Sequence, residues 1–212
     1  MVTHAQAAKQ AENRHQILKT AEYVFARDGF AGARMDEIAR KAQVNKAMIY
    51  YHIGNKRELY AEVLHHIFSD AIDRFKTSIQ QAETPEKKLR QYLRNIIQTI
   101  GQNPGAAAIL IREQATGGAD FPDVIIKDMS KIVMMLVEIL DHGYQQGVFR
   151  KSNPFAVHML AIGSILLTHT SYPIRRRFPV EPPEIERQKQ QPIETTLKDI
   201  MALILNAVRK HS

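Results

Sequence analysis

The feature that most constrains the fold is a long apolar pattern in the first half of the chain. From Lys56 onward, an apolar residue recurs at every fourth position. This spacing places the side chains on one face of an α-helix, and it predicts a helix about 37 Å long. No alternation of Val, Ile or Thr elsewhere predicts a strand, so the sequence predicts an all-α fold. The residues of the pattern are Leu59, Val63, Ile67, Ala71, Phe75 and Ile79.

Further helical patterns fill most of the chain, and caps or glycines mark their ends. Asp28-Gly29 ends the first helix, because Gly adopts the left-handed conformation of a C-terminal cap. Residues 172–192 are rich in Pro, Arg and Glu with little periodicity, and we expect a long exposed loop there. The patterns predict about nine helices, which begin near residues 11, 35, 46, 56, 85, 105, 121, 154 and 193.

Positive charge is concentrated near the N-terminus. The 212-residue chain has a formal net charge of +7, and residues 1–60 carry +4 of it, from ten Lys or Arg against six Asp or Glu. Residues 61–212 carry the remaining +3 and are nearly balanced. From Ile38 to Arg57 there are five basic residues and no acidic one. A charge excess confined to one segment favours a nucleic-acid-binding surface.

Composition also limits the cellular context. The chain has no Cys, which excludes a disulfide framework and a thiolate metal site. No charged-then-apolar signal segment opens the chain, so we expect a cytoplasmic protein. The longest apolar run, at 156–168, contains His158 and is too short to span a bilayer. We expect a buried helix there and no membrane partner.

The N-terminal segment has the size of a helix-turn-helix unit, which is built from short helices joined by tight turns. Residues 1–10 lack a strong pattern and are expected to form a flexible N-terminal arm. We therefore divide the chain into this arm, a helix-turn-helix DNA-binding domain at 11–58, and a larger helical domain at 59–212.

The stretch VNKAMIYYHI at 44–53 is predicted to contain the helix that enters the major groove of DNA. Asn45 is a good N-cap, so this helix begins at Lys46, with Ile49 and Ile53 facing inward. A Lys amine donates to guanine, an Asn amide pairs with adenine, and Ala or Met packs on a thymine methyl. Tyr hydroxyls and His reach phosphates. The candidate DNA-binding residues here are Asn45, Lys46, Ala47, Met48, Tyr50, Tyr51 and His52.

The segment GNKRE at 54–58 follows directly and predicts the start of the next helix. Asn55 and Glu58 form a capping box, which places Lys56 at the first helical position. A cation is unfavourable there, because the helix dipole already presents positive charge. Lys56 is therefore expected to bind a DNA phosphate together with the backbone N–H groups of this helix end. The alternative is a solvated Lys beside half-buried tyrosines.

These residues give the stretch from Arg14 to Leu59 a specific resemblance to the DNA-binding domain of the TetR family of transcriptional regulators. The resemblance implies that Lys46 and Met48 read bases, while the two tyrosines, His52 and Lys56 hold the DNA backbone. It also implies that the domain at 59–212 binds a small effector and forms a homodimer through the last two helices. The matching positions are Ile17-Leu18, Ala21, Phe25, Gly29-Phe30, Met35 to Ala39, Val44 to Lys46, Ile49 to Ile53, Lys56 and Leu59.

Several positions depart from the family pattern. Gln43 stands where Gly is usual in the turn, so a left-handed conformation there costs about 1 kcal/mol. Arg34 replaces the common Ser or Thr cap of the second helix and offers a phosphate or minor-groove contact instead. Met48 replaces a frequent Thr, and Ile53 replaces a Phe of the core. DNA binding is still expected, but the operator preference cannot be taken from relatives.

The 154–170 helix and the last helix are apolar on more than one face, so each must be covered on two sides. We therefore expect them to form a four-helix interface across a two-fold axis. The alternative is that both helices are buried within one subunit. The expected interface residues are Phe155, Leu160, Leu197, Met201, Ile204 and Val208.

Polar residues that interrupt apolar helices are the candidates for an effector pocket. They are Arg112, Glu113 and His158, and Met134 adds an adaptable lining, although Met at helical spacing is usually core. Arg112 pairs either with an acidic ligand or within the protein, with Glu113 or a neighbouring helix. We expect a largely apolar small-molecule effector and no cofactor.

Together these features predict a dimeric repressor that binds a palindromic double-stranded DNA operator, with two reading helices about 34 Å apart, and leaves it when the effector binds. One alternative is a metal-dependent helical enzyme built on Glu62, His65 and His66. The H-E-x-x-H motif is absent, so neither a metal site nor an enzyme is expected. A second alternative is a sequence-neutral DNA-binding protein, which would need basic charge along the whole chain.

Overall fold

The computed structural model describes residues 4–103, 105–177, 179 and 183–210, and this part of the chain is built from helices. Its β geometry is confined to an isolated antiparallel bridge between Phe149 and Arg209. The all-α prediction is confirmed. The ten helices described are α1 (His4–Gly32), α2 (Met35–Lys41), α3 (Lys46–His52), α4 (Lys56–Gln80), α5 (Pro85–Gln102), α6 (Ala106–Ala115), α7 (Asp123–Gln145), α8 (Pro154–Arg175), α9 (Pro183–Lys189) and α10 (Ile193–Val208).

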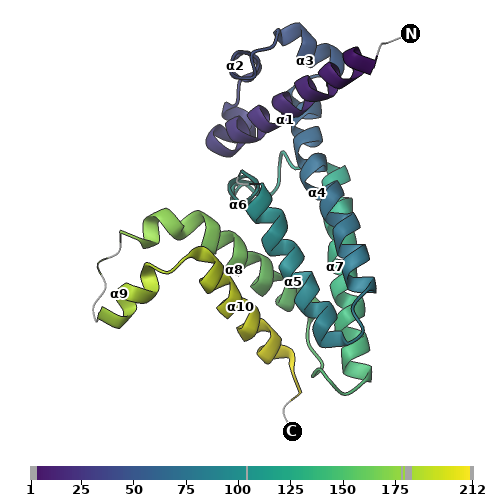
Figure 1. The fold of residues 1–212 in the computed structure, drawn as a ribbon, viewed down its shortest axis with the longest axis vertical. Coiled ribbons are helices and arrows are strands. Elements are labelled where there is room, and N and C mark those ends of the chain that lie inside the picture. The colour runs from purple at the N-terminus through teal and green to yellow at the C-terminus, as the bar shows by residue number, and fades with distance from the viewer. Residues whose placement is uncertain (1–3, 104, 178, 180–182, 211–212) are drawn as a thin grey trace.

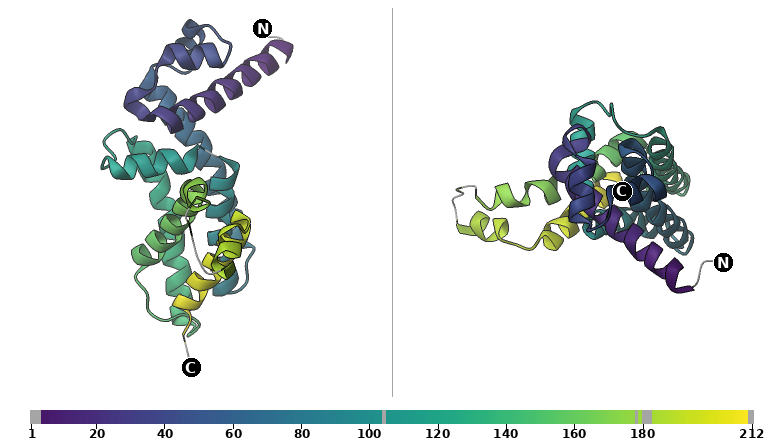
Figure 2. Two further views of the ribbon diagram at one scale, coloured as in Figure 1. Left: turned by 90° about the vertical axis from the view of Figure 1, so that its left-hand side faces the viewer. Right: turned by 90° about the horizontal axis from the view of Figure 1, so that it is seen from above.

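The helices form a small group at one end of the molecule and a larger bundle beside it (Figure 1). α1, α2 and α3 make the small group, and α4 runs from this group into the bundle, where it packs against α5 and α7. α8 and α10 pack against each other, and α9 lies at the end of the projection that they form (Figure 2). α6 contacts both α1 and α8, so it connects the two groups.

The apolar pattern of α4 explains how the two groups are joined. Leu59, Val63, Ile67, Ala71 and Phe75 are all buried, as their four-residue spacing predicts. The helix contacts α1 as well as α5 and α7. Because of this stripe, one hydrophobic cluster extends from residues of α1 to residues of α10.

The predicted capping box at the start of α4 is present. Asn55 Oδ1 accepts hydrogen bonds from the backbone N–H groups of Arg57 (2.9 Å) and Glu58 (3.1 Å), and Glu58 Oε2 accepts one from Asn55 N–H (2.7 Å). Gly54 makes this box possible, because its φ is +115° and a Cβ there would lie 2.0 Å from Glu58 Oε2. The start of α4 is therefore fixed by contacts within five residues.

The turn between α2 and α3 confirms the strained position predicted from the sequence. Gln43 has a φ of +57° and is the one non-glycine residue with positive φ in the described part of the chain. Val44 N–H donates to Ala39 O at 3.0 Å, which closes the turn and sets the angle between the two helices. Asn45 then caps α3 through a 2.9 Å hydrogen bond from Ala47 N–H, also as predicted.

Two predictions about irregular segments were wrong. α1 begins at His4, so residues 4–10 are helical where the sequence predicted a flexible arm, and residues 1–3 lie outside the described part. The loop predicted at 172–192 is also largely helical. α8 continues to Arg175 with Pro173 in its last turn, where the lost N–H bond disturbs few neighbours, and α9 follows at Pro183–Lys189.

The composition that suggested a loop at α9 has a different physical meaning. Pro183 occupies the first position of the helix, where its missing N–H leaves no bond unmade. Glu184 and Glu186 lie in the first turn, and Arg187 and Lys189 lie in the last turn. This order of charges matches the helix dipole. Pro, Glu and Arg therefore stabilise this short helix, which is why the expected nine helices become ten.

α8 is also longer than the apolar run that marked it in the sequence. Its 22 residues are long and apolar enough to cross a membrane by length and composition, and it is the one helix of the described residues that meets this test. A core helix of a soluble protein meets the same test, and α8 packs against α5, α6, α7 and α10. Its length and composition are therefore weak support for a membrane span.

Replacing Gln43 by Gly should raise the free energy of unfolding by about 1 kcal/mol, because Gly adopts positive φ without the steric cost that an L side chain meets. The Gln43 side chain is exposed, so the substitution removes no buried contact. The matched control is Gln81→Gly, at an exposed C-cap with an ordinary φ of −74°. Urea unfolding at one fixed protein concentration measures both variants. Equal effects of the two substitutions would contradict the strain at Gln43.

Candidate functional site

The outer face of α3 carries the cationic and aromatic side chains that the sequence predicts to contact DNA. Ile49 is fully buried, which turns the opposite side of this short helix toward solvent. Tyr51 is 85% exposed and Tyr50 is 48% exposed, an unusual position for two large rings. We name this face the reading surface. It consists of Lys46, Ala47, Met48, Tyr50, Tyr51 and His52.

Lys46 is held in place by two neighbours on the reading side. Its Nζ lies 2.8 Å from Asp36 Oδ1, on the first turn of α2, and 5.9 Å from the centroid of the Tyr50 ring. The hydrogen bond with Asp36 raises the pKa of Lys46, so the amine stays charged. Arg34 is exposed at the N-cap of α2 and makes no side-chain bond to that helix end.

Lys56 has an intramolecular partner that the sequence did not reveal. Its Nζ donates a 3.0 Å hydrogen bond to Ala31 O and lies 4.8 Å from the centroid of the Phe30 ring. The amine therefore faces the end of α1, and a backbone carbonyl offsets the unfavourable placement of a cation at the start of α4. The inference that Lys56 requires an external anion loses its force, because the protein itself supplies an acceptor.

α1 has a non-helical residue at Gly29 (φ +72°, ψ 174°), so its longer helical segment ends there, as the sequence predicted, and this segment and α6 cap each other's ends. Glu22 Oε1, on α1, accepts a 2.8 Å hydrogen bond from Gly105 N–H, at the N-cap of α6, which has no cap of its own. In return Arg112, on the last turn of α6, donates from Nε to Ala26 O (3.2 Å) and from Nη2 to Arg27 O (2.8 Å). An acid at a helix N-terminus and a base at a C-terminus are both favourable. We name these hydrogen bonds the α1–α6 contact.

The location of Arg112 corrects a sequence prediction. Arg112 was expected to be one of the polar residues of an effector pocket. Its guanidinium instead donates hydrogen bonds to carbonyls of α1 at the molecular surface. The alternative left open by the sequence, pairing with a neighbouring helix, describes the contact. Arg57 adds a weaker link to the same region, with Nη2 3.7 Å from Asp120 Oδ1 just after α6.

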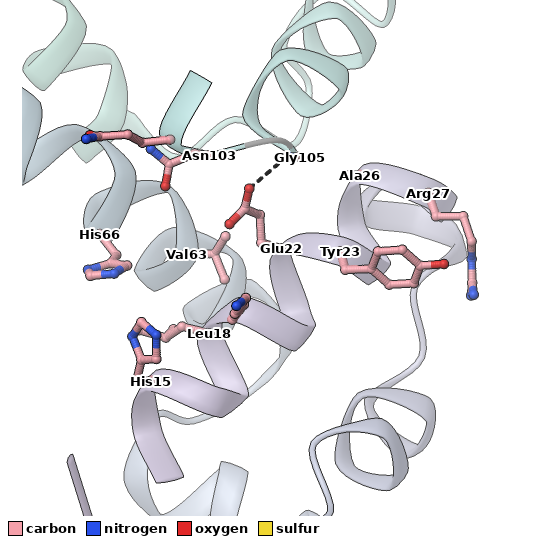
Figure 3. Close-up of a pocket in the computed structure, with 12 residues that line it drawn as sticks. His15, Leu18, Glu22, Tyr23, Ala26, Arg27, Val63, His66, Asn103 and Gly105 are labelled. Atoms are coloured by element: carbon pink, nitrogen blue, oxygen red, sulfur yellow. Dashed lines mark hydrogen bonds between the residues drawn. The ribbon is translucent and has the colours of Figure 1, made fainter. Parts of the chain in front are cut away.

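An open groove of about 610 Å³ lies beside the α1–α6 contact, between α1, α4 and the end of α5 (Figure 3). His15 and Glu22 line it from α1, His66 lines it from α4, and Asn103 lies across from them. Burial raises the pKa of Glu22, while the Gly105 N–H and the charges of nearby basic groups partly oppose this shift. The groove leaves one side of α1 open, while buried residues of the same helix, such as Ile17 and Phe25, belong to the core, and α1 packs against α2, α4 and α6.

Glu113 is buried in a contact between α6 and α4. Its Oε1 accepts a 2.6 Å hydrogen bond from the Tyr60 hydroxyl on α4, and its Oε2 is buried without a hydrogen-bond partner. Burial, followed by this hydrogen bond, raises the pKa of Tyr60. Glu113 was predicted to line an effector pocket, but it lies inside the α4–α6 contact instead.

An apolar cavity of about 40 Å³ lies within the bundle, between α4, α5, α6, α7 and α8. His158, a candidate effector-pocket residue, lines this cavity, and its Nδ1 is 2.8 Å from the Tyr92 hydroxyl. Burial lowers the pKa of His158, so the ring is neutral at pH 7. The other lining residues are Phe68, Ala71, Phe75, Ile96, Thr99, Ile100, Leu110, Met129, Ile132 and Ile162.

The size of this cavity decides what it holds in its present form. A volume of about 40 Å³ holds little more than a water molecule, whereas small-molecule sites measure about 300–1,000 Å³. Met134, predicted to line the pocket, is 54% exposed on the outer side of α7 and lies away from the cavity. Binding of an organic ligand in this cavity therefore requires the surrounding helices to move apart.

The exposed faces of α8 and α10 form an apolar surface. Phe155 is 66% exposed, Leu160 51% and Leu203 69%. Of the predicted interface residues, Phe155 and Leu160 lie on this surface. The four predicted on α10 face the core of their own subunit, which is the alternative that the sequence left open for that face of the helix. Those buried residues are Leu197, Met201, Ile204 and Val208.

The side chains of the metal-enzyme alternative have other partners. Glu62 accepts a hydrogen bond from Arg14, and His65 lies 3.7 Å from Asp128. His66 faces the groove, with its ring 6.2 Å from that of His15. The described residues include no group of three ligating side chains that could hold a metal ion.

Sequence reasoning missed Asp36, Glu22 and Gly105. Asp36 belongs to the segment MDEIA, which was used only as a motif, and its proximity to Lys46 depends on the angle between α2 and α3. Glu22 and Gly105 are 83 residues apart, so no local pattern links them. The one available signal was that the first turn of α6 lacks a capping side chain.

Comparisons with known proteins agree with this geometry. Residues 17–63 match the family model described as bacterial regulatory proteins, tetR family, and residues 85–174 match that of the tetracyclin repressor-like C-terminal domain. The transcriptional repressor NicS of Pseudomonas putida is 31% identical over 175 residues, which are 77% of this chain and 79% of the relative. The repressor SCO4008 of Streptomyces coelicolor is 49% identical over 59 residues, 27% of this chain and 31% of its own.

Solved structures share the whole fold at low identity. The ketosteroid transcriptional regulator KstR2 of Mycobacterium tuberculosis superposes with a TM-score of 0.72 at 18% identity, covering 93% of this chain and 95% of its own. A linker-substituted mutant of HlyIIR, a hemolysin II transcriptional regulator, gives a TM-score of 0.71 at 23% identity over 96% and 98% of the two chains. The chain therefore belongs to the tetR family of bacterial regulatory proteins and is a DNA-binding transcriptional regulator.

Proposed function

We propose that this regulator is a cytoplasmic repressor that binds a palindromic DNA operator as a homodimer and leaves it when a largely apolar effector binds. The observation that carries the proposal is the reading surface, where exposed rings and a charged amine share the outer face of a short, well-capped helix. Single-stranded or sequence-neutral binding would not require such a helix at this position.

The geometry refines which residues contact DNA. Lys46 and Met48 are suited to base edges, and the exposed tyrosines, His52 and Arg34 are suited to phosphates. The side-chain oxygen of Asn45 already accepts a hydrogen bond from Ala47 N–H, so pairing with adenine would use the second lone pair of this oxygen together with the amide N–H donors. Lys56 keeps further N–H donors beside its bond to the α1 carbonyl, so a weak phosphate contact is part of the proposal.

The apolar surface of α8 and α10 supports a homodimer. Side chains as large as Phe155 and Leu203, more than half exposed on neighbouring helices, are typical of a surface that a partner covers. A second copy related by a two-fold axis presents the same surface and completes a four-helix interface. A dimer with two-fold symmetry presents one reading surface to each half-site of a palindromic operator.

The cavity and the reading surface are linked through α6. Leu110 of α6 lines the cavity, and the same helix bonds α1 through Glu22 and Arg112 and α4 through Glu113. A ligand that forces the cavity open displaces α6, so it favours a state in which these bonds are altered. Its effect on DNA affinity equals its preference for that state. The neutral His158 offers one polar contact to an otherwise apolar effector.

The proposed DNA binding is tested by selecting ligands of the purified protein from a random duplex library. Lys46→Met should lower affinity for the enriched palindrome at least tenfold and relax the preference at one base pair in each half-site, because a specific base contact is lost. Lys151→Met, at an exposed position just before α8, is the control. Wild-type protein should prefer the palindrome about a thousandfold over unrelated DNA, and equal binding to both would support the sequence-neutral alternative.

The proposed dimer interface is tested with Leu203→Asp, which places a charge on the apolar surface. We expect a shift from dimer to monomer in analytical ultracentrifugation, together with loss of operator binding, because a buried unpaired charge is costly. Ile126→Asp is the matched control, since Ile126 is 51% exposed on α7, away from α8 and α10. If both Leu203→Asp and Ile126→Asp remained dimeric, this surface would not be the dimer interface.

The link through α6 is tested with Gly105→Ala. A Cβ at this position would lie 2.8 Å from Glu22 Cγ and 3.2 Å from Ala26 Cβ, so α1 must move away from α6. We expect about 1–3 kcal/mol of destabilisation and a several-fold loss of operator affinity by fluorescence anisotropy. Gly101→Ala is the control, because a Cβ there meets nothing within 4 Å. The link is wrong if Gly105→Ala leaves operator affinity at the level of Gly101→Ala.

A further inference from the structure

Asp36 is an acidic residue where a DNA-binding surface should exclude one. It lies on the first turn of α2, its side chain is 77% exposed, and its carboxylate is 2.8 Å from the amine of Lys46 on α3. In a helix-turn-helix unit the first of these helices crosses the DNA backbone. A carboxylate at that place repels phosphates and weakens sequence-independent attraction.

An acid in the first turn of α2 matches the helix dipole, but this effect requires no contact with Lys46, and the ion pair itself adds little to folding stability. Ion pairs between exposed side chains contribute little to stability, and the Lys46 side chain is itself 42% exposed. The neighbouring Glu37 differs, because it points to α1 and pairs with Arg27 at 2.8 Å. Asp36 therefore acts on the reading surface, and its contact there is Lys46.

The number of hydrogen-bond donors on Lys46 indicates what the pairing achieves. A Lys amine has three N–H donors, and Asp36 accepts one of them. Two donors remain, which matches the two adjacent acceptors O6 and N7 of guanine in the major groove. The Tyr50 ring, 5.9 Å from the amine, limits its movement on the other side. An unpaired Lys, by contrast, is a flexible point charge that binds any phosphate within reach.

We propose that Asp36 is a positioning residue that makes Lys46 selective for guanine and suppresses its attraction to phosphates. This proposal rests on the proposed function, because it concerns the same reading surface. Asp36 acts through Lys46, so its removal should increase affinity for unrelated DNA while it decreases discrimination between bases. A residue with only a structural role would weaken binding to all DNA alike.

The experiment compares Asp36→Asn with the wild type on three duplexes at several salt concentrations. The first duplex is the palindrome that the wild type enriches from a random library. The second duplex carries adenine in place of one guanine of the palindrome. This guanine is the one whose replacement weakens binding by the wild type but not by Lys46→Met. The third duplex is unrelated in sequence. For Asp36→Asn we expect several-fold tighter binding to unrelated DNA, with a salt slope steeper by about 0.9 because one more phosphate is neutralised. Discrimination between the first two duplexes should fall about tenfold.

Two further variants separate the proposal from simpler explanations. Asp36→Glu keeps the carboxylate and should retain most of the discrimination. Asp73→Asn removes the same charge from an exposed position far along α4 and should change neither quantity. Asp36→Asn with wild-type salt slope and discrimination, or with equal weakening on all three duplexes, overturns the role of Asp36. A wild-type protein that enriches no sequence overturns the proposed function itself.

Discussion

The reciprocal capping of α1 and α6 is the polar contact that fixes how α1 lies on the bundle, in addition to the apolar packing of α1 on α4. Glu22 supplies the cap that α6 lacks, and Arg112 covers the carbonyls at the end of α1. A charge at a helix end contributes about 0.3–1 kcal/mol, and up to about 2 kcal/mol where it is partly buried. The coupling energy by which a ligand typically alters a distant site is about 1–3 kcal/mol. The contact is therefore strong enough to orient α1 and weak enough for an effector to alter.

The cavity of the bundle is small. At about 40 Å³ it admits no organic ligand without displacement of the surrounding helices. Leu110 lies in its wall and belongs to α6, which also forms hydrogen bonds with α1. Closely packed interiors respond to an inserted ligand by moving whole elements. In the proposed function, expansion of this cavity and movement of α6 are one structural change, and no separate relay is required.

Features decided within a few residues could be predicted from the sequence. The N-cap at Asn45 and the capping box at Asn55 depend only on neighbouring backbone groups, and both were predicted correctly. The positive φ of Gln43 was implied by the family resemblance, because Gly is usual at this position of the turn. The apolar stripe of α4 was equally clear, since its period is that of a helix.

Features decided by the rotation and packing of whole helices could not be predicted in this way. α10 is apolar most of the way round, so its pattern does not say that Leu197 faces its own core while Leu203 faces outward. Arg112 interrupts an apolar helix as a pocket residue would, but its partner is 85 residues away in sequence. Lys56 also has a distant partner, at Ala31, which removed the reason to require an external anion. In each case the deciding neighbour is brought close by the fold alone.

The central claim is that the α1–α6 contact sets the orientation of α1, and with it α2 and α3, relative to the bundle. It is tested most directly by the distance between spin labels at Gln16→Cys on α1 and Glu138→Cys on α7, both exposed positions in a chain that has no native Cys. Labelled protein is diluted with unlabelled protein, so that pulsed electron paramagnetic resonance reports distances within one chain. With Arg112 present, the account predicts a single narrow distribution, which broadens or shifts in Arg112→Ala. An identical distribution in both proteins would contradict it.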